Sequence, residues 1–203
     1  ELGTDARSLL AATDLIVHGT TVATNALLER KGAKVGMLTT EGHRDIIEMR
    51  EGLKDDRYNL RMPPPIPLAP RGRRLGVRER MRFDGKVATP LDRRSLEGAI
   101  ARIKRMGVNS VAVCYLHSYA NASHERATRR ALERLLPSVY VSLSSEVLPQ
   151  IKEYERFGTT VVNAYVGPAL AVYLGRLDER LKAGGYQRQV LIMQSHGGVA
   201  GVT

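Results

Sequence analysis

The sequence predicts an α/β protein in which short strands alternate with helices around a parallel or mixed sheet. Apolar runs rich in β-branched residues are typical of strands, and they lie at residues 15–18, 34–40, 110–116, 139–143 and 189–194. Segments with a helical spacing of apolar residues separate most of these runs. This order favours βαβ units, whose ligands bind at the carboxyl ends of the strands.

The first elements are a strand, a turn and a helix. Gly19 breaks the strand over residues 15–18, and the helical pattern over residues 22–31 closes at Gly32. After the next strand, we expect a second, shorter helix over residues 43–50.

Proline interrupts the periodic pattern over residues 51–70. The prolines that fix φ and remove backbone donors there are Pro63, Pro64, Pro65, Pro67 and Pro70. We predict an extended arm for this segment. Residues 76–83 then alternate with period two and meet Asp84 and Gly85, and residues 86–89 return, which predicts an antiparallel hairpin.

The remaining helices have clear start and stop signals. Asp92 is a suitable N-cap for a helix that ends at Gly107, and Pro137 stops a helix over residues 121–136. The longest helical pattern covers residues 150–183, and we expect Gly167 and Pro168 to kink or split it.

These elements predict three parts of the chain. Residues 1–50 form an α/β start, residues 51–90 a proline-rich arm and hairpin excursion, and residues 91–203 an α/β continuation that ends at a glycine-rich turn. Because the chain begins without methionine and stops inside that turn, we expect a piece of a longer protein.

The formal net charge of +10 is local. Residues 71–105 hold 12 basic and 4 acidic side chains, which accounts for +8 of it. A basic nucleic-acid-binding module is the lowest-ranked function, because aromatic residues make up only 5% of the chain and no recognition motif appears. An interface or a substrate-steering surface is the better interpretation, and an arm over residues 51–90 that grips a partner subunit is compatible with it.

Membrane and disulfide classes have little support. No run approaches the roughly 18 consecutive apolar residues of a membrane span. The single cysteine, Cys114, lies in an apolar run and is expected to pack as a small hydrophobe. We therefore expect a cytoplasmic protein that binds neither membrane nor nucleic acid.

Two glycine-containing turns at strand ends are the best candidates for a binding site. The first comprises His18, Gly19, Thr20 and Thr21, with Asn25 one helical turn further on, and its N–H groups and hydroxyls suit an anion. Capping of the helix by Thr20 or Thr21 is the competing interpretation. The second comprises Ser195, His196, Gly197 and Gly198, for which a structural turn is equally compatible.

Other chemistry is less well supported. Asn163 interrupts an apolar stripe and marks either a packing contact or a site. Adjacent residues of an extended chain point to opposite faces, which disfavours catalysis by Ser195 and His196 as a pair. The histidines show no metal-ligand spacing, so we expect no metal site, and neither a dinucleotide fingerprint nor a phosphate loop is present.

Several motifs occur in a fixed order along nearly the whole chain. They are HGTTVATNALLERKG at residues 18–32, TTEGHRD at 39–45, PLAPR at 67–71, VRER at 77–80, YER at 154–156 with NAY at 163–165, and MQSHGG at 193–198. Together they resemble the hydantoinase A/oxoprolinase family, which includes N-methylhydantoinase, 5-oxoprolinase and the related subunits of acetone and acetophenone carboxylases.

The resemblance implies part of an actin-like ATPase fold, of the acetate kinase and ribonuclease H-like type, with the proline-rich hairpin excursion inserted. It also implies an enzyme that uses ATP, with a divalent cation such as Mg²⁺, to activate a carbonyl for hydrolysis of a cyclic amide. An ATP-dependent ketone carboxylase is the alternative. The implied partner is a hydantoinase B-type subunit in a hetero-oligomer.

The resemblance also sets limits on this segment. The phosphate motifs of the family would precede Glu1 and follow Thr203, so the segment alone is expected to be inactive and to hold no ATP. The family usually has Asn where His196 stands. The stretch over residues 50–62 looks closer to lactam- or aromatic-ketone-type members than to plain hydantoinases, and the catalytic residues stay unassigned.

Overall fold

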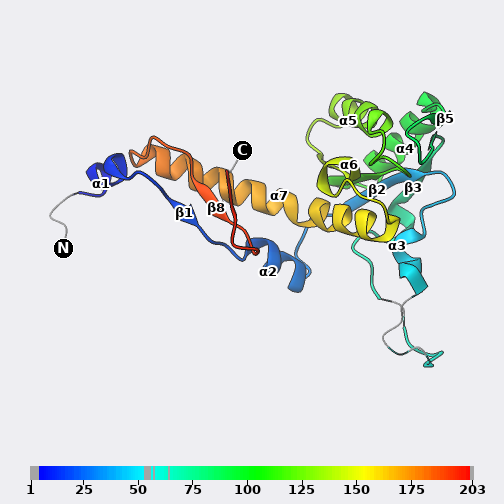
Figure 1. Cartoon of the computed structure of the whole chain (residues 1–203), viewed down its shortest axis with the longest axis horizontal. Coiled ribbons are helices and arrows are strands. Elements are labelled where there is room, and N and C mark those ends of the chain that lie inside the picture. The colour runs from blue at the N-terminus through cyan, green and yellow to red at the C-terminus, as the bar shows by residue number, and fades with distance from the viewer. Residues whose placement is uncertain (1–4, 53–55, 57, 64, 202–203) are drawn as a thin grey trace. The chain divides into compact units, whose positions relative to one another are not determined.

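A computed structural model of the chain describes residues 5–52, 56, 58–63 and 65–201 (Figure 1). It consists of two compact units. Unit 1 combines the two ends of the chain, residues 1–32 and 167–203, and unit 2 comprises residues 33–166. The three-part division of the chain at residues 50 and 90 concerns segments rather than compact units, and it stays a prediction.

Unit 2 is built on a four-stranded parallel sheet in the order β3-β2-β6-β7. Its strands are β2 (Val35–Thr40), β3 (Arg74–Val77), β6 (Ser110–Cys114) and β7 (Tyr140–Leu143). Every residue of β2 and β6 is buried, as the continuous apolar runs predict for central strands covered on both faces. The α/β class predicted from the sequence is confirmed.

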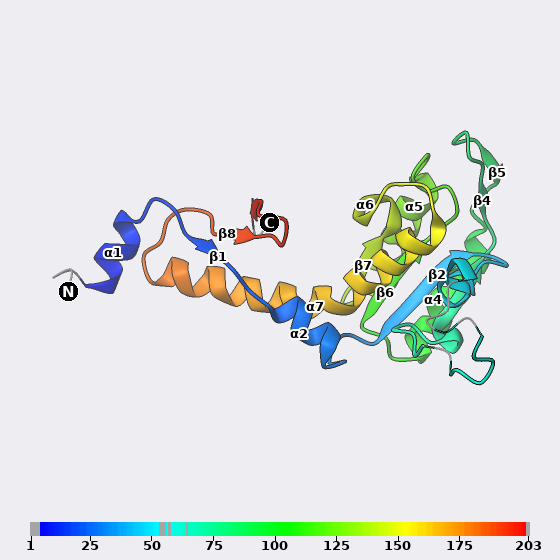
Figure 2. The ribbon, with the colours of Figure 1, turned by 60° about the horizontal axis from the view of Figure 1, so that its bottom comes forward.

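Helices cover the two faces of this sheet (Figure 2). On one face, α4 (Arg93–Arg105) and α5 (Ser123–Leu135) bury Ile103 and Leu132 against Leu38 and Val113. On the other face, Cys114 is fully buried and its thiol lies against Thr160 of α7 (Glu153–Ala183). The predicted packing role of Cys114 is confirmed.

The predicted ends of α4 are also present. The Asp92 carboxylate accepts the Ser95 N–H at 2.9 Å, and Gly107 has φ of +60° after the last turn. A short α3 (Ile46–Met49) follows β2, and α6 (Ser144–Val147) follows β7. The predicted helix over residues 43–50 is therefore real but shorter.

The predicted hairpin is correct in kind and wrong in extent. Residues up to Val77 belong to β3, which pairs in parallel with β2, and only β4 (Arg80–Met81) pairs with β5 (Val87–Thr89) across the predicted turn. The edge of β2 offers a full row of backbone partners, which outweighs the continuation of a two-stranded ribbon.

The predicted arm holds no strand over its described part. The 3-10 turns η1 (Arg50–Gly52) and η2 (Arg71–Arg73) flank it. Residues 53–55, 57 and 64 lie outside the described residues, and with them part of the stretch over residues 50–62.

Unit 1 has a mixed three-stranded sheet in the order β1-β8-β9. β1 (Val17–His18) pairs in parallel with β8 (Leu191–Met193), and β8 pairs antiparallel with β9 (Val199–Gly201). The helices of this unit are α1 (Ala6–Ala12), α2 (Val22–Leu28) and the second part of α7.

The helix α7 is continuous over 31 residues with Pro168 inside it, so the predicted split is absent. The two units divide at this point, between Val166 and Gly167. By length and composition alone, α7 could cross a membrane. Within unit 2, its Phe157, Val161 and Ala164 are buried, and this packing accounts for much of its apolar character there.

We predict that Leu132→Ala lowers the free energy of unfolding by about 2–5 kcal/mol, because Leu132 is fully buried in the core. Leu135→Ala, in the same helix at 39% exposure, is the matched control and should change it by less than about 1 kcal/mol. Urea unfolding at constant slope measures both, and equal effects would contradict the described core.

Candidate functional site

The two predicted glycine-containing turns lie at one edge of the sheet in unit 1. His18 is the last residue of β1 and is paired with Ile192 of β8. Because these strands are parallel, the turn after His18 and the turn after Met193 leave the same edge. The structure therefore brings together His18 to Thr21 with Ser195 to Gly198.

The first turn has its polar groups partly engaged. The His18 Nε2 atom lies 2.8 Å from the Tyr173 hydroxyl of α7. The Val22 N–H donates to the Thr20 hydroxyl at 3.3 Å, whereas Thr21, the N-cap residue, makes no side-chain cap. The Asn25 amide instead donates to the Thr21 hydroxyl at 3.4 Å. Capping is thus weak, and Gly19 has open space around its Cα.

The second turn joins β8 to β9. The Gln194 N–H donates to the Gly198 carbonyl at 2.8 Å, and Gly197 adopts φ of +87°, a conformation that favours glycine. The His196 Nδ1 atom accepts the Gly198 N–H at 3.2 Å. Ser195 and His196 are both exposed. The imidazole is held by the backbone rather than by Ser195, which agrees with the argument against a Ser–His pair.

Asn163 lies in unit 2, apart from the other predicted residues. Its amide donates to the Ser142 hydroxyl of β7 at 2.9 Å. This bond joins α7 to the sheet. Within unit 2, Asn163 therefore makes a packing contact, which was one of its two predicted roles.

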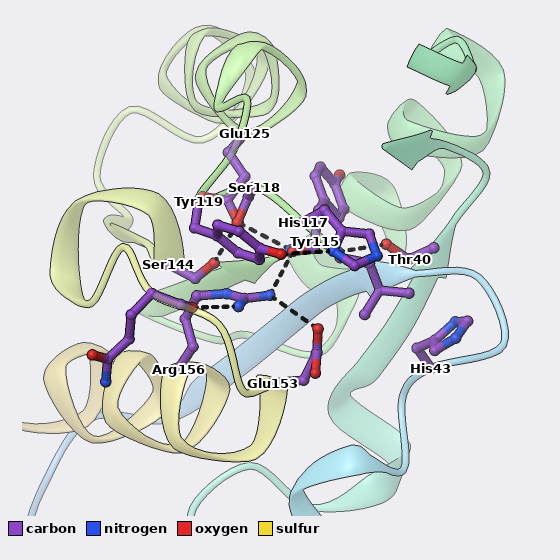
Figure 3. Close-up of polar contacts among 12 residues, drawn as sticks. Thr40, His43, Tyr115, His117, Ser118, Tyr119, Glu125, Ser144, Glu153 and Arg156 are labelled. Atoms are coloured by element: carbon purple, nitrogen blue, oxygen red, sulfur yellow. Dashed lines mark hydrogen bonds and ion pairs between the residues drawn. The ribbon is translucent and has the colours of Figure 1, made fainter. Parts of the chain in front are cut away.

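A larger polar network lies at the carboxyl ends of the strands of unit 2 (Figure 3). Thr40 ends β2, and its hydroxyl accepts the Leu116 N–H at 3.0 Å and makes a short hydrogen bond to Glu79. The Glu79 carboxylate, 3% exposed, also accepts from His124 Nδ1 at 2.8 Å. A buried carboxylate that orients an imidazole leaves Nε2 as the other reactive nitrogen.

Glu125 is the best satisfied acid of this network. It is fully buried, and its carboxylate accepts the Tyr115 N–H at 3.0 Å, the Ser144 hydroxyl at 2.7 Å and the Ser145 N–H at 2.8 Å. Burial raises the pKa of Glu125, and these hydrogen bonds oppose the increase. The carboxylate joins the residues that follow β6 to those that follow β7.

Arg156 of α7 is the buried cation of the same edge. Its Nη1 donates to the Gln150 carbonyl at 2.7 Å and its Nη2 to the Tyr115 carbonyl at 3.3 Å. The guanidinium carbon lies 5.2 Å from the centroid of the Tyr119 ring, and Glu153 is 3.9 Å from Nη2. Its Nε has no partner among the described residues.

Two histidines lie at the same edge of unit 2. The His43 Nδ1 atom is 3.1 Å from the Glu41 carbonyl, and its Nε2 atom is 3.4 Å from Nη1 of Arg80. His117 has φ of +53° and lies 3.2 Å from the Tyr119 hydroxyl. Among the described residues, no three His, Cys, Asp or Glu side chains are grouped for a metal ion.

The sequence analysis missed this network. One signal was present in the sequence. Glu125, Thr128 and Leu132 recur at helical spacing, so they share the buried face of α5. A charged residue at such a position demands partners, and these come from distant strands. Glu79 and Arg156 lie in the motifs VRER and YER that carry the family resemblance, but no local pattern predicts that their side chains are buried.

Comparisons with known proteins agree with the order of the motifs. The model of the hydantoinase/oxoprolinase N-terminal region matches residues 3–136, and that of hydantoinase/oxoprolinase matches residues 156–203. The chain belongs to the hydantoinase/oxoprolinase family. The predicted resemblance is thereby confirmed.

Relatives within this family are known by sequence and structure. The chain is 41% identical, over 98% of its length, to caprolactamase subunit alpha of Pseudomonas jessenii, and 34% identical, over 100%, to the acetophenone carboxylase gamma subunit of Aromatoleum aromaticum. It covers 29% of each relative. The crystal structure of the ATP-dependent caprolactamase matches 98% of the chain with a TM-score of 0.89, and the chain covers 29% of that structure.

We predict a pH-dependent effect of Glu125→Gln on stability. The folded state raises the pKa of Glu125 above its ordinary value of 4.5, so it binds the proton more tightly than the unfolded state does. The unmodified protein should therefore lose stability relative to the variant as the pH rises from 4.5 through the folded pKa. Urea unfolding of both proteins across this range tests the sign, and a difference that is constant or of opposite slope would contradict it.

Proposed function

We propose that the full-length protein is the ATP-dependent subunit of a cyclic-amide hydrolase. The observation that carries this proposal is the 41% identity to caprolactamase subunit alpha over 98% of the chain, together with the matching fold. The family membership and the paired turns of unit 1 support it.

The chemistry explains why ATP is needed. An unstrained amide carbonyl resists attack by water, and transfer of the γ-phosphoryl group to its oxygen converts that oxygen into a leaving group. Water then adds to the carbon and the C–N bond opens, which leaves an acyl phosphate. A second water hydrolyses this acyl phosphate, so ADP, phosphate and an amino acid result. Catalysis of such transfers rests mainly on positioning and electrostatics.

The donor set of unit 1 suits a phosphate. The edge formed by β1 and β8 presents the hydroxyls of Thr20, Thr21 and Ser195, and Ser195 is exposed. The N–H groups of Gly197 and Gly198 donate within their own turn. We assign phosphate contacts to these two turns, with Asn25 in support. Bound ATP with Mg²⁺ would supply the phosphoryl group, and this chain's residues would hold it in position.

The same relatives support proposals for the fold, the location and the partner of the full-length protein. We propose that the chain is part of an actin-like ATPase fold in a cytoplasmic enzyme, and that it pairs with a hydantoinase B-type partner in a hetero-oligomer. Relatives named as alpha and gamma subunits support the multi-subunit assembly. We expect the 203-residue segment to be inactive alone, because it covers less than a third of those relatives.

A ketone carboxylase subunit is the second candidate. The 34% identity to the acetophenone carboxylase gamma subunit favours it, and the same carbonyl activation would serve carboxylation. The nucleic-acid module ranks below both, because many arginines of residues 71–82 bind acids within unit 2. These pairs are Arg71 with Asp45, Arg74 with Glu48, Arg78 with Asp92 and Arg82 with Asp84.

We predict that the full-length protein with its partner hydrolyses ATP faster when a cyclic amide is present. The assay compares ε-caprolactam, 5-oxoproline, hydantoin and acetophenone, and it detects ADP together with the ring-opened or carboxylated product. ATP hydrolysis that is stimulated by acetophenone with bicarbonate, and by none of the cyclic amides, would favour the carboxylase. No turnover of any substrate would overturn the assignment.

We predict that His196→Ala raises the KM for ATP about 2- to 10-fold, the range of one neutral hydrogen bond, because the Gly198 N–H loses its acceptor. His196→Asn is the matched control. Its side-chain oxygen can accept the same N–H, so we expect a KM within about twofold of the unmodified value. Equal effects of the two variants would show that this hydrogen bond does not shape the nucleotide site.

A further inference from the structure

Unit 2 has a second kind of polar surface, a hollow beside the outermost strand of its sheet. The strand β3 stands at one end of the sheet order, and α4 packs on it through Leu75, which is buried with Ile100 and Ile103 in the core. The hollow measures about 390 Å³ and is lined by residues of β3 and α4 alone. It therefore belongs to one strand, one helix and one compact unit.

The lining is basic and contains no acidic residue. Its charged members are Arg94, Arg102 and Arg105, and all three are exposed. Among the described residues, neither Arg102 nor Arg105 forms an ion pair. The acid nearest to Arg94 in sequence is Asp92, whose carboxylate is bound by Arg78 at 3.2 Å. The three guanidinium groups therefore keep capacity for an anionic ligand.

This cluster explains where the local excess of positive charge remains after folding. Residues 71–105 carry 12 basic and 4 acidic side chains, and four arginines of residues 71–82 bind acids within unit 2. The helix α4 has five basic side chains and a single acid, Glu97, which lies 3.6 Å from Arg134 of α5. The charge that stays unpaired is thus on α4, and it attracts acidic partners.

The strand β3 adds a backbone donor and a backbone acceptor to the hollow. The Val77 carbonyl accepts the Glu41 N–H at 2.9 Å, so the backbone groups of Val77 point toward β2. Successive strand residues point these groups to opposite sides, and Gly76, which is exposed and lines the hollow, therefore points its own to the free edge. The start of α4 already binds both groups of the next outward residue, Arg78.

The wall formed by α4 is low between two of the arginines. Gly98 lies one helical turn from both Arg94 and Arg102, and a Cβ placed on it would meet nothing within 4 Å. Ala101, also exposed, lines the hollow as well. A peptide backbone can approach α4 at these small residues while the guanidinium groups on either side reach its side chains.

This combination of groups favours an extended polypeptide over a small anion. A phosphate would satisfy the arginines, but it would leave the Gly76 carbonyl without a donor. An added strand supplies N–H and C=O together, and carboxylate side chains match the paired N–H groups of arginine. From Arg94 to Arg105 the helix rises about 16 Å, which suits roughly five residues of extended chain. The lining has no aromatic residue on which a nucleobase could stack.

We propose that this hollow docks an extended acidic segment of the partner subunit. The inference rests on the proposed hetero-oligomer, and it names the face of this chain and the chemistry of the partner. The segment pairs with Gly76 as a short additional strand, and its carboxylates bind Arg94, Arg102 and Arg105.

The test uses the full-length protein with its partner and compares two variants that have the same change of charge. Arg102→Glu/Arg105→Glu reverses two arginines of the hollow, whereas Lys104→Glu/Arg126→Glu reverses two exposed cations of α4 and α5 that do not line it. The first should raise the Kd of the complex at least tenfold in surface plasmon resonance, because the reversed charges repel the acidic segment. The second should stay within threefold.

Two further measurements separate this contact from a general effect of charge. If Arg102→Glu/Arg105→Glu fails to fold by circular dichroism, Arg102→Gln/Arg105→Gln replaces it and should raise the Kd at least fivefold. Added NaCl should weaken the unmodified complex more than the complex of the variant, which has fewer attractive charges to screen. A photocrosslinker at Ala101, introduced by Ala101→p-benzoylphenylalanine, should react with an acidic segment of the partner.

The outcomes distinguish this inference from the proposed function. Equal weakening of the complex by the two charge-reversal variants would overturn the inference alone, as would a crosslink from residue 101 to this chain itself or to nucleic acid. Absence of any complex with the unmodified protein would overturn the proposed hetero-oligomer and the inference with it. Stimulation of ATP hydrolysis by a cyclic amide tests the proposed activity separately.

Discussion

The buried carboxylate of Glu125 is the contact on which the polar network at the carboxyl edge of unit 2 depends. A parallel sheet that is covered on both faces leaves the polar groups beyond its strand ends without water. Glu125 accepts bonds from Tyr115, which follows β6, and from Ser144 and Ser145, which follow β7. Removing it would leave the N–H groups of Tyr115 and Ser145 without this acceptor, which costs more than the bonds contribute. The positions of the neighbouring loops, including the Ser118 hydroxyl 2.9 Å from Ser144, follow from this contact.

The same edge shows why α7 begins where it does. Arg156 is fully buried, and a buried guanidinium must be satisfied by acceptors. Two carbonyls, at Gln150 and Tyr115, accept from Nη1 and Nη2 and fix the first turn of α7 against the end of β6. Lys152, with φ of +77°, lies between Gln150 and Arg156, which the Nη1 bond joins. The contacts of Arg156 therefore account for both the strained backbone of Lys152 and the position of Tyr154.

Sequence patterns predicted the strands and helices of this chain well, because long apolar runs and caps such as Asp92 act locally. The sequence patterns failed where the hydrogen-bonding partner of a segment is distant in sequence. Residues 74–77 form an edge strand because β2 offers hydrogen-bond partners. Pro168 lies within a continuous helix, although proline there removes a backbone hydrogen bond. The glycine-containing turns of unit 1 were found because their residues are adjacent in sequence. The motifs that contain Glu79 and Arg156 were recognised, but the buried network that these residues form with Glu125 was not predicted, because its members come together only in the folded sheet.

The polar groups of the two units differ in kind. The turns at the edge of β1 and β8, for which we propose phosphate contacts, offer the hydroxyls of Thr20, Thr21 and Ser195 with no carboxylate among residues 18–21 and 195–198. The strand ends of unit 2 instead gather buried carboxylates, Glu79 and Glu125. The helix α7 contributes to both units, with Tyr173 beside His18 in one and Arg156 beside Glu153 in the other. One continuous element thus supplies polar side chains to both units.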